Sequence, residues 1–82
     1  MKSDMYLGVY SFYDLKNKLF APPFTEFSKV DACRRFDAIR HDERSVVSRY
    51  PSDFEFYKLC EINLSTGAIT ECKELLDVES FV

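Results

Sequence analysis

The spacing of apolar and polar residues predicts strands near both ends of the chain and a helix between them. Residues 6–13 and 54–62 are dominated by aromatic and aliphatic side chains, which suit the pleated, half-buried surface of a strand. Pro51 disfavours the helical conformation at Tyr50, so an earlier helix has to end before the second run. We therefore expect residues 54–62 to form a central strand on which the other elements pack.

The first strand is expected to lead into a hairpin. Gly8 within it should mark a bulge or a close backbone approach. The polar residues 14–18 predict a loop, and residues 19–21 predict a short return strand. The two prolines that follow cannot donate backbone hydrogen bonds, so the return strand should lie at a sheet edge. Two phenylalanines are then expected to fold back over the core: Phe24 and Phe27.

A helix is predicted from Lys29 to His41 or Asp42. Ser28 is its expected N-cap, and Asp31 in the first turn suits the helix dipole. Helical spacing predicts a buried stripe with Ala32 flanking it; the stripe consists of Val30, Cys33, Phe36 and Ile39. The outer face is expected to carry charged residues, namely Arg34, Arg35, Asp37, Arg40 and His41.

The remaining segments complete the order β-β-α-β-β. Residues 45–49 predict a short helical turn, residues 63–67 a hairpin loop with Gly67 at positive φ, and residues 68–72 the last strand. We expect one α+β domain over residues 1–82, a four-stranded, mainly antiparallel sheet with one helix packed on one face. The face of the sheet opposite the helix also has to be covered, and packing against a second copy of the chain in a homodimer would cover it. Residues 74–82 could either dock on the domain or form a flexible acidic tail.

The charge distribution narrows the possible functions. The net charge is −3, which argues against a general nucleic-acid-binding protein. However, residues 29–49 hold all five arginines and one lysine against four acidic residues, whereas residues 50–82 hold two lysines against seven acidic residues. The middle segment therefore remains a local candidate for phosphate contacts.

Cysteine and histidine usage predicts neither a cofactor nor a metal site. The three cysteines are odd in number and lack CxxC spacing, and there is one histidine, so we expect reduced thiols rather than disulfides or zinc. An enzyme is not expected, because His41 and Asp42 have no partnered nucleophile and two glycines cannot form a glycine-rich phosphate loop. No apolar run predicts a signal peptide or a membrane segment, so a cytosolic protein is expected.

Three blocks of sequence resemble the small non-structural protein of gokushovirus-type microviruses, which are single-stranded DNA bacteriophages. The blocks are YSFYD at 10–14 with FAPPF at 20–24, ACRRF at 32–36, and SRYPSDF at 48–54 with YKL at 57–59 and STGAI at 65–69. The resemblance implies a protein absent from the virion and expressed in the host bacterial cytoplasm. It also implies a role in DNA replication, at the switch from double-stranded to single-strand synthesis.

Two hypotheses for function follow. In the first, the chain binds single-stranded DNA or a phage or host replication protein, with phosphate contacts from Lys29, Arg34, Arg35, Arg40, Arg44 and Arg49. Tyr10 and Tyr13 are the candidate rings for base stacking, although both could instead belong to the strand core. In the second, the chain is a homodimeric interaction module that binds a host or phage protein through its acidic C-terminal third and contacts no nucleic acid.

Overall fold

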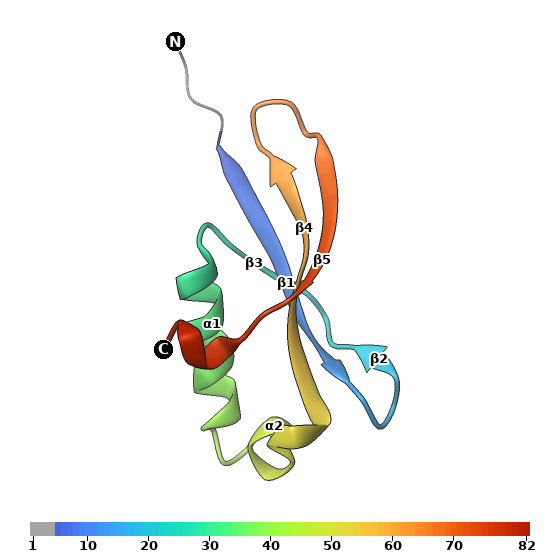
Figure 1. Cartoon of the computed structure of the whole chain (residues 1–82), viewed down its shortest axis with the longest axis vertical. Coiled ribbons are helices and arrows are strands. Elements are labelled where there is room, and N and C mark those ends of the chain that lie inside the picture. The colour runs from blue at the N-terminus through green and yellow to red at the C-terminus, as the bar shows by residue number, and fades with distance from the viewer. Residues whose placement is uncertain (1–4) are drawn as a thin grey trace.

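The chain folds as one antiparallel sheet with a helix on one face (Figure 1). The computed structural model describes residues 5–82. The α+β prediction is confirmed. The elements in chain order are β1 (Tyr6–Asp14), β2 (Leu19–Phe20), β3 (Phe24–Glu26), α1 (Lys29–Arg40), α2 (Val46–Arg49), a 3₁₀ turn (Pro51–Asp53), β4 (Phe54–Asn63), β5 (Ile69–Leu75) and a second 3₁₀ turn (Val78–Ser80).

The two long strands, β1 and β4, occupy the middle of the sheet. The strand order is β2-β1-β4-β5, so the expectation of a central strand beginning at Phe54 is confirmed. β3 was not predicted. It pairs with β1 opposite Gly8, Val9 and Tyr10, because the chain reverses after the two prolines and runs back along the same edge. β2 and β3 therefore share one side of β1.

The helix α1 begins where the sequence indicates. The Ser28 side chain accepts a hydrogen bond from the Asp31 amide at 3.1 Å. The buried residues are Ala32, Cys33 and Phe36. Val30 was expected in the stripe but is 39% exposed, since the buried arc centres on Phe36 and Val30 lies about 120° around the helix from it. Phe27 is also exposed, so the expectation that it anchors the core is wrong.

Aromatic rings from the sheet and the helix form the centre of the core. Phe56 stacks on Phe36 with ring centroids 4.7 Å apart, and it stacks on Tyr10 and Phe24 at 5.9 Å each. The C-terminal segment closes the core from the β5 side. Leu76 and Val78 in this segment are buried, and Phe81 packs against the same cluster, so residues 74–82 are docked rather than a free tail.

Two irregularities shape the long strands. The pairing of β1 with β4 shifts register between Val9 and Tyr10, and that of β4 with β5 shifts between Lys58 and Cys60. Lys73 in β5 has a φ of 42°, a left-handed conformation within this second irregularity. Gly8 lies under the ring of Tyr10, so the predicted close approach is present there.

Candidate nucleic-acid interface

The basic residues of α1 do not form one exposed phosphate-binding face. Lys29 and Arg40 lie within about 40° of Phe36 around the helix, on the side turned toward the core. Arg40 was expected on the outer face, but only 21% of its side chain is exposed. Arg34 and Arg35 point outward, as predicted. The basic residues of α1 are therefore distributed over two sides of the helix.

Four of the six predicted phosphate-binding cations have carboxylate partners. Two of these pairs link distant parts of the chain, Lys29 with Glu74 at 2.9 Å and Arg35 with Glu26 at 3.0 Å. The other two cations pair nearby or with the C-terminal turn: Arg44 with Asp42, and Arg40 with Asp37 and Glu79. Each partner competes with phosphate for the cation, so these four positions are weak candidates for binding DNA.

Arg40 and Arg35 also have structural roles. Partial burial alone would lower the pKa of Arg40, but the hydrogen bonds that Arg40 donates to Asp37 and Glu79 outweigh burial and raise that pKa. The guanidinium of Arg35 lies 4.4 Å from the centroid of the Phe24 ring, within range of a cation–π contact. Both side chains therefore tie α1 to neighbouring segments.

Arg34 and Arg49 are the two predicted cations that remain unpaired. Neither has a carboxylate within 4.0 Å among residues 5–82, and both are exposed. They belong to different helices, α1 and α2, and so do not constitute a cluster by themselves.

The two predicted stacking rings lie on opposite faces of the sheet. Tyr10 is 1% exposed and faces α1, where burial raises its pKa. Its ring has no face open to a base, so it is not a stacking residue in this conformation. Tyr13 lies three positions further along β1, on the face that α1 leaves open.

On this open face Tyr13 is joined by two rings that sequence reasoning missed. The Tyr13 and Phe20 centroids are 4.8 Å apart, and those of Phe20 and Tyr57 are 5.5 Å apart. Phe20 is 37% exposed and the two tyrosines are half-buried. Burial and the neighbouring Glu55 carboxylate, which accepts a hydrogen bond from the Tyr57 hydroxyl, raise the pKa of Tyr57. We call these three residues the ring trio; the period-two alternation of both strands would have identified its two tyrosines.

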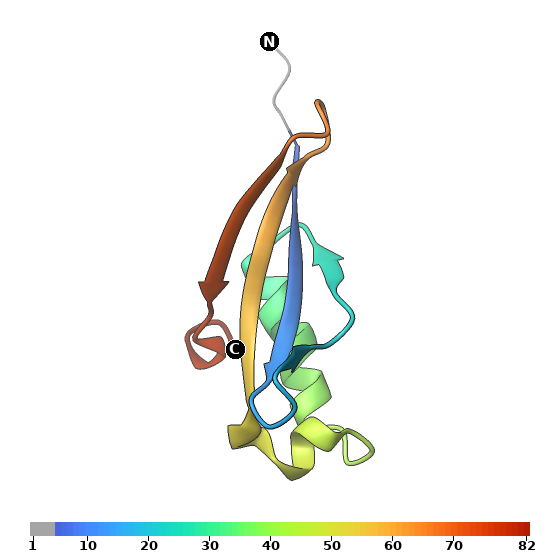
Figure 2. The ribbon, with the colours of Figure 1, turned by 90° about the vertical axis from the view of Figure 1, so that its right-hand side faces the viewer.

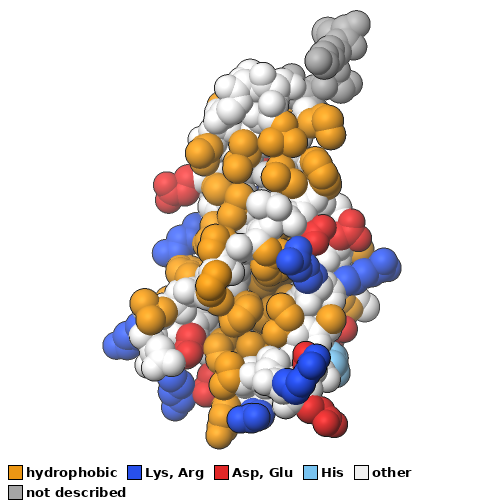
Figure 3. Space-filling model, turned by 180° about the vertical axis from the view of Figure 1, so that it is seen from behind, with side chains coloured by type: hydrophobic (Ala, Val, Ile, Leu, Met, Phe, Trp, Pro, Cys, Tyr) orange, Lys and Arg blue, Asp and Glu red, His pale blue; other side chains and the backbone are white. Residues whose placement is uncertain are grey.

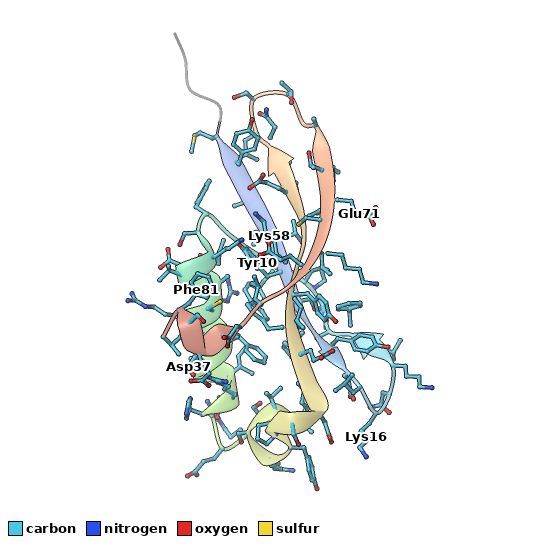
Figure 4. The ribbon with its side chains drawn as sticks, viewed as in Figure 1. Tyr10, Lys16, Asp37, Lys58, Glu71 and Phe81 are labelled. Atoms are coloured by element: carbon cyan, nitrogen blue, oxygen red, sulfur yellow. The ribbon has the colours of Figure 1, made fainter. Side chains whose placement is uncertain are left out.

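The turn between β1 and β2 places two lysines beside the ring trio. Asp14 organises this turn by accepting hydrogen bonds from the amides of Lys16 and Asn17 and from the Asn17 side chain. Lys18 adopts a left-handed φ of 59°, which allows the chain to return into β2. Lys16 and Lys18 are exposed, and within the described chain neither has a carboxylate partner. Figure 4 shows Lys16 at the end of the turn, away from α1.

A hollow of about 220 Å³ lies at the base of this turn. It is bordered by the turn itself, by α2 and by the start of β4. Tyr50 on its border is 58% exposed and directly follows Arg49. The hollow therefore lies between the turn that carries Lys16 and the α2 segment, and Arg49 is not among the residues that line it.

The hydrogen bonds of Asp14 predict a pH dependence. Amide donation from Asn17 is the largest influence on the pKa of Asp14 and holds it below its usual value. Because the unfolded chain binds this proton at higher pH, the stabilisation is present at neutral pH and is lost as pH falls through the lowered pKa. We expect the free energy of unfolding, measured by urea titration, to fall between about pH 5 and pH 2. Asp14→Asn should flatten this dependence; an unchanged slope would contradict the assignment.

The structure gives His41 and Cys33 of the α1 region different surroundings from those considered in the sequence. His41 Nδ1 lies 2.8 Å from the carbonyl oxygen of Asp37 and 3.4 Å from its carboxylate, rather than pairing with Asp42. Cys33 is buried, and burial raises the pKa of its thiol. Between residues 5 and 82 no three metal-binding side chains are grouped, and no helix has the length and apolar character required to cross a membrane.

Comparison with known proteins gives one result. A family model described as Phage ORF5 protein matches residues 7–81, which is nearly the whole chain. The searches of curated proteins and of solved structures found no match to this chain. The matched region includes every strand except the first residue of β1, and both helices. The chain therefore belongs to the Phage ORF5 protein family and is a small bacteriophage protein.

Proposed function

We propose that this phage protein is a non-structural accessory of genome replication that binds single-stranded DNA on the open face of its sheet. The observation that carries the proposal is the ring trio, Tyr13, Phe20 and Tyr57, with Lys16 and Lys18 on the adjoining turn. The protein would act in the host bacterial cytoplasm, at the switch to single-strand synthesis. The proposal assigns no catalytic step to the chain.

The geometry favours single strands over duplex DNA. Aromatic rings on a sheet face can stack on bases that have no partner strand, while nearby cations contact the backbone. Lys16 and Lys18 supply such cations beside Phe20 without competition from a carboxylate in the described chain. The acidic excess of residues 50–82 includes Glu74 and Glu79, which pair with α1 on the other side of the sheet. Glu55 shares the face of the ring trio, where it accepts a hydrogen bond from the Tyr57 hydroxyl, so a strand following β1 and β2 would direct its phosphates toward Lys16 and Lys18 and away from Glu55.

The test is fluorescence anisotropy with single-stranded and duplex oligonucleotides of the same sequence, at two salt concentrations. Phe20→Ala should weaken single-strand binding at least about fivefold, since one base–ring stack contributes about 1–3 kcal/mol. The double variant Lys16→Gln/Lys18→Gln should lose two phosphate contacts. Its affinity should therefore fall less steeply with salt, with the magnitude of the slope of log affinity against log salt concentration reduced by about 1.4. At both salt concentrations the protein should bind the duplex oligonucleotide more weakly than the single-stranded one.

Arg34→Gln is the matched control. It removes an exposed, unpaired cation of the same chain from the outer side of α1 and should leave both affinity and salt slope unchanged. The proposal would be wrong if Arg34→Gln and Arg49→Gln abolished binding while the two lysine substitutions did not. Failure of the wild-type protein to bind any oligonucleotide at low salt would also exclude it.

The pairing of the basic residues favours a second candidate function, a protein-interaction module. Four of the six cations in residues 29–49 are held by carboxylates, and the net charge is −3. In this case the partner is a host or phage protein, the chain contacts no nucleic acid, and the protein contact is largely apolar. Binding to such a partner would change little with salt, whereas phosphate binding weakens steeply as salt rises.

A further inference from the structure

Glu55 is a charged residue that lies among the rings of the ring trio. It is directly opposite Tyr13 in the pairing of β1 with β4, and side chains paired in this way point to the same face. It also precedes Tyr57 by two positions in β4, which places both on that face. Figure 2 looks onto this open face, with α1 behind the strands. Glu55 is therefore flanked by both tyrosines of the ring trio.

The Glu55 carboxylate is held on one side and available on the other. The Tyr57 hydroxyl donates a hydrogen bond of 3.3 Å to its Oε1. Among residues 5–82, Oε2 has no hydrogen bond and no cation within 4.0 Å. The side chain is half-buried rather than enclosed. Because a carboxylate has about four lone-pair sites, Glu55 keeps most of its capacity to accept hydrogen bonds from a ligand.

Glu55 differs from the carboxylates that pair with cations elsewhere on the protein. Charged side chains of both signs lie close together over much of the surface seen from behind (Figure 3). Glu74 and Glu26, for example, pair with Lys29 and Arg35. Glu55 contacts a tyrosine instead. On a surface that binds DNA an unpaired carboxylate repels phosphates, so it weakens binding unless it contacts another part of the nucleotide.

A base edge with N–H donors is the part of a nucleotide that suits a carboxylate, which accepts hydrogen bonds and donates none. Guanine has two donors side by side, N1–H and the 2-amino group, which match the two oxygens of one carboxylate. Adenine and cytosine each present one amino group next to an accepting ring nitrogen, and thymine presents one N–H between two carbonyl oxygens. In a single strand these edges are unpaired and accessible to a side chain.

We propose that Glu55 makes the ring trio selective for guanine. This inference rests on the proposed binding of single-stranded DNA, and it names the base that the same site prefers. A guanine stacked on the ring trio would present its Watson–Crick edge to Glu55, while its phosphate lies toward the turn that carries Lys16 and Lys18. Tyr57 is then a positioning residue as well as a stacking ring, because its hydroxyl orients the carboxylate.

The test compares three short single-stranded oligonucleotides by fluorescence anisotropy. One alternates thymine and guanine, the second carries inosine at every guanine position, and the third contains thymine alone. Inosine lacks the 2-amino group of guanosine and keeps N1–H, so the first two oligonucleotides differ by one donor group at each such position. The wild type should bind the guanine oligonucleotide about tenfold more tightly than the inosine one, as expected for a hydrogen bond to a charged group. The thymine oligonucleotide should bind no more tightly than the inosine one.

Glu55→Gln should reduce the preference for guanine over inosine to below about twofold, because the amide replaces one accepting oxygen with a donor and removes the charge. Glu71→Gln is the matched control. Glu71 is exposed, has no hydrogen-bond or ion-pair partner within the described chain, and projects away from α1 (Figure 4). Its substitution removes the same charge, so it should change the affinity for all three oligonucleotides by a similar factor and leave the preference at about tenfold.

Tyr57→Phe tests the positioning role. It keeps the ring and removes the hydroxyl that donates to Glu55. Affinity for the thymine oligonucleotide should stay within about twofold of wild type, whereas the preference for guanine over inosine should fall by about threefold. Each preference is a ratio measured on one protein, so a smaller folded fraction in a variant cancels out of it.

The outcomes separate this proposal from single-strand binding itself. Equal affinity of the wild type for the guanine and inosine oligonucleotides would overturn the role of Glu55 and leave single-strand binding in place. A preference that survives Glu55→Gln, or one that Glu71→Gln also removes, would overturn it in the same way. If the wild type bound none of the three oligonucleotides, both proposals would be wrong.

Discussion

Phe56→Ala is expected to lower the free energy of unfolding by about 3–5 kcal/mol. Phe56 is 2% exposed and stacks with Tyr10, Phe24 and Phe36, so its removal leaves a cavity between the sheet and α1. A domain of this size has a total stability of about 4–12 kcal/mol, so the loss is a large fraction of the whole. Thermal unfolding followed by circular dichroism should show a midpoint lowered by more than about 12 °C.

Phe20→Ala is the matched control for this prediction. It removes the same ring from a two-residue edge strand where the side chain is 37% exposed, so the expected loss is below about 1.5 kcal/mol. Equal losses for the two substitutions would show that the stack of Phe56 on α1 is not the centre of the core. Phe56→Leu, which keeps most of the volume, should recover more than half of the lost stability.

Gly8→Ala is expected to destabilise the protein by about 1–3 kcal/mol, the usual cost of overpacking. A Cβ at this position would lie 2.5–2.8 Å from three atoms of the Tyr10 side chain, two ring carbons and the hydroxyl oxygen. That ring is fully buried between β1 and the core, so it cannot move aside without disturbing Phe56 and Phe24. The urea midpoint of the variant measures the effect.

A double-mutant cycle identifies the cause. Tyr10→Leu removes the ring atoms that the new methyl group would meet, so Gly8→Ala should cost less in the Tyr10→Leu background than in the wild type. Additive losses would contradict the steric explanation. Gly67→Ala offers a contrast, since its Cβ would meet nothing within 4 Å and its cost, about 1 kcal/mol, would come from the φ of 79°.

Local rules predicted much of the fold. Ser28 as a cap, Pro51 as a helix stop and the aromatic run from Phe54 all lie at observed element boundaries. β3 was missed because its pairing depends on where the chain passes after Pro23, and three residues carry too little pattern to reveal a strand. Val30 was misplaced because apolar spacing alone does not determine how far a short helix is rotated about its axis.

The candidate site was less predictable because it depends on contacts distant in sequence. Lys29 is paired with Glu74, 45 residues away, and no local pattern indicates such a partner. The period of two places Tyr10 and Tyr13 on opposite faces of the strand, but only the position of α1 shows which of these faces is buried. Phe20 joined the ring trio through the pairing of β2 with β1, which brings it beside Tyr13.

The left-handed Lys73 in β5 limits how the protein can polymerise. All seven residues of β5 are exposed, and β5 forms one border of the sheet. A straight, exposed strand would be a template for adding chain after chain, as in amyloid fibrils. The kink at Lys73 interrupts the regular row of backbone donors and acceptors, and charged neighbours on both sides oppose stacking of identical strands. The open border of the sheet is therefore a poor template for fibril growth.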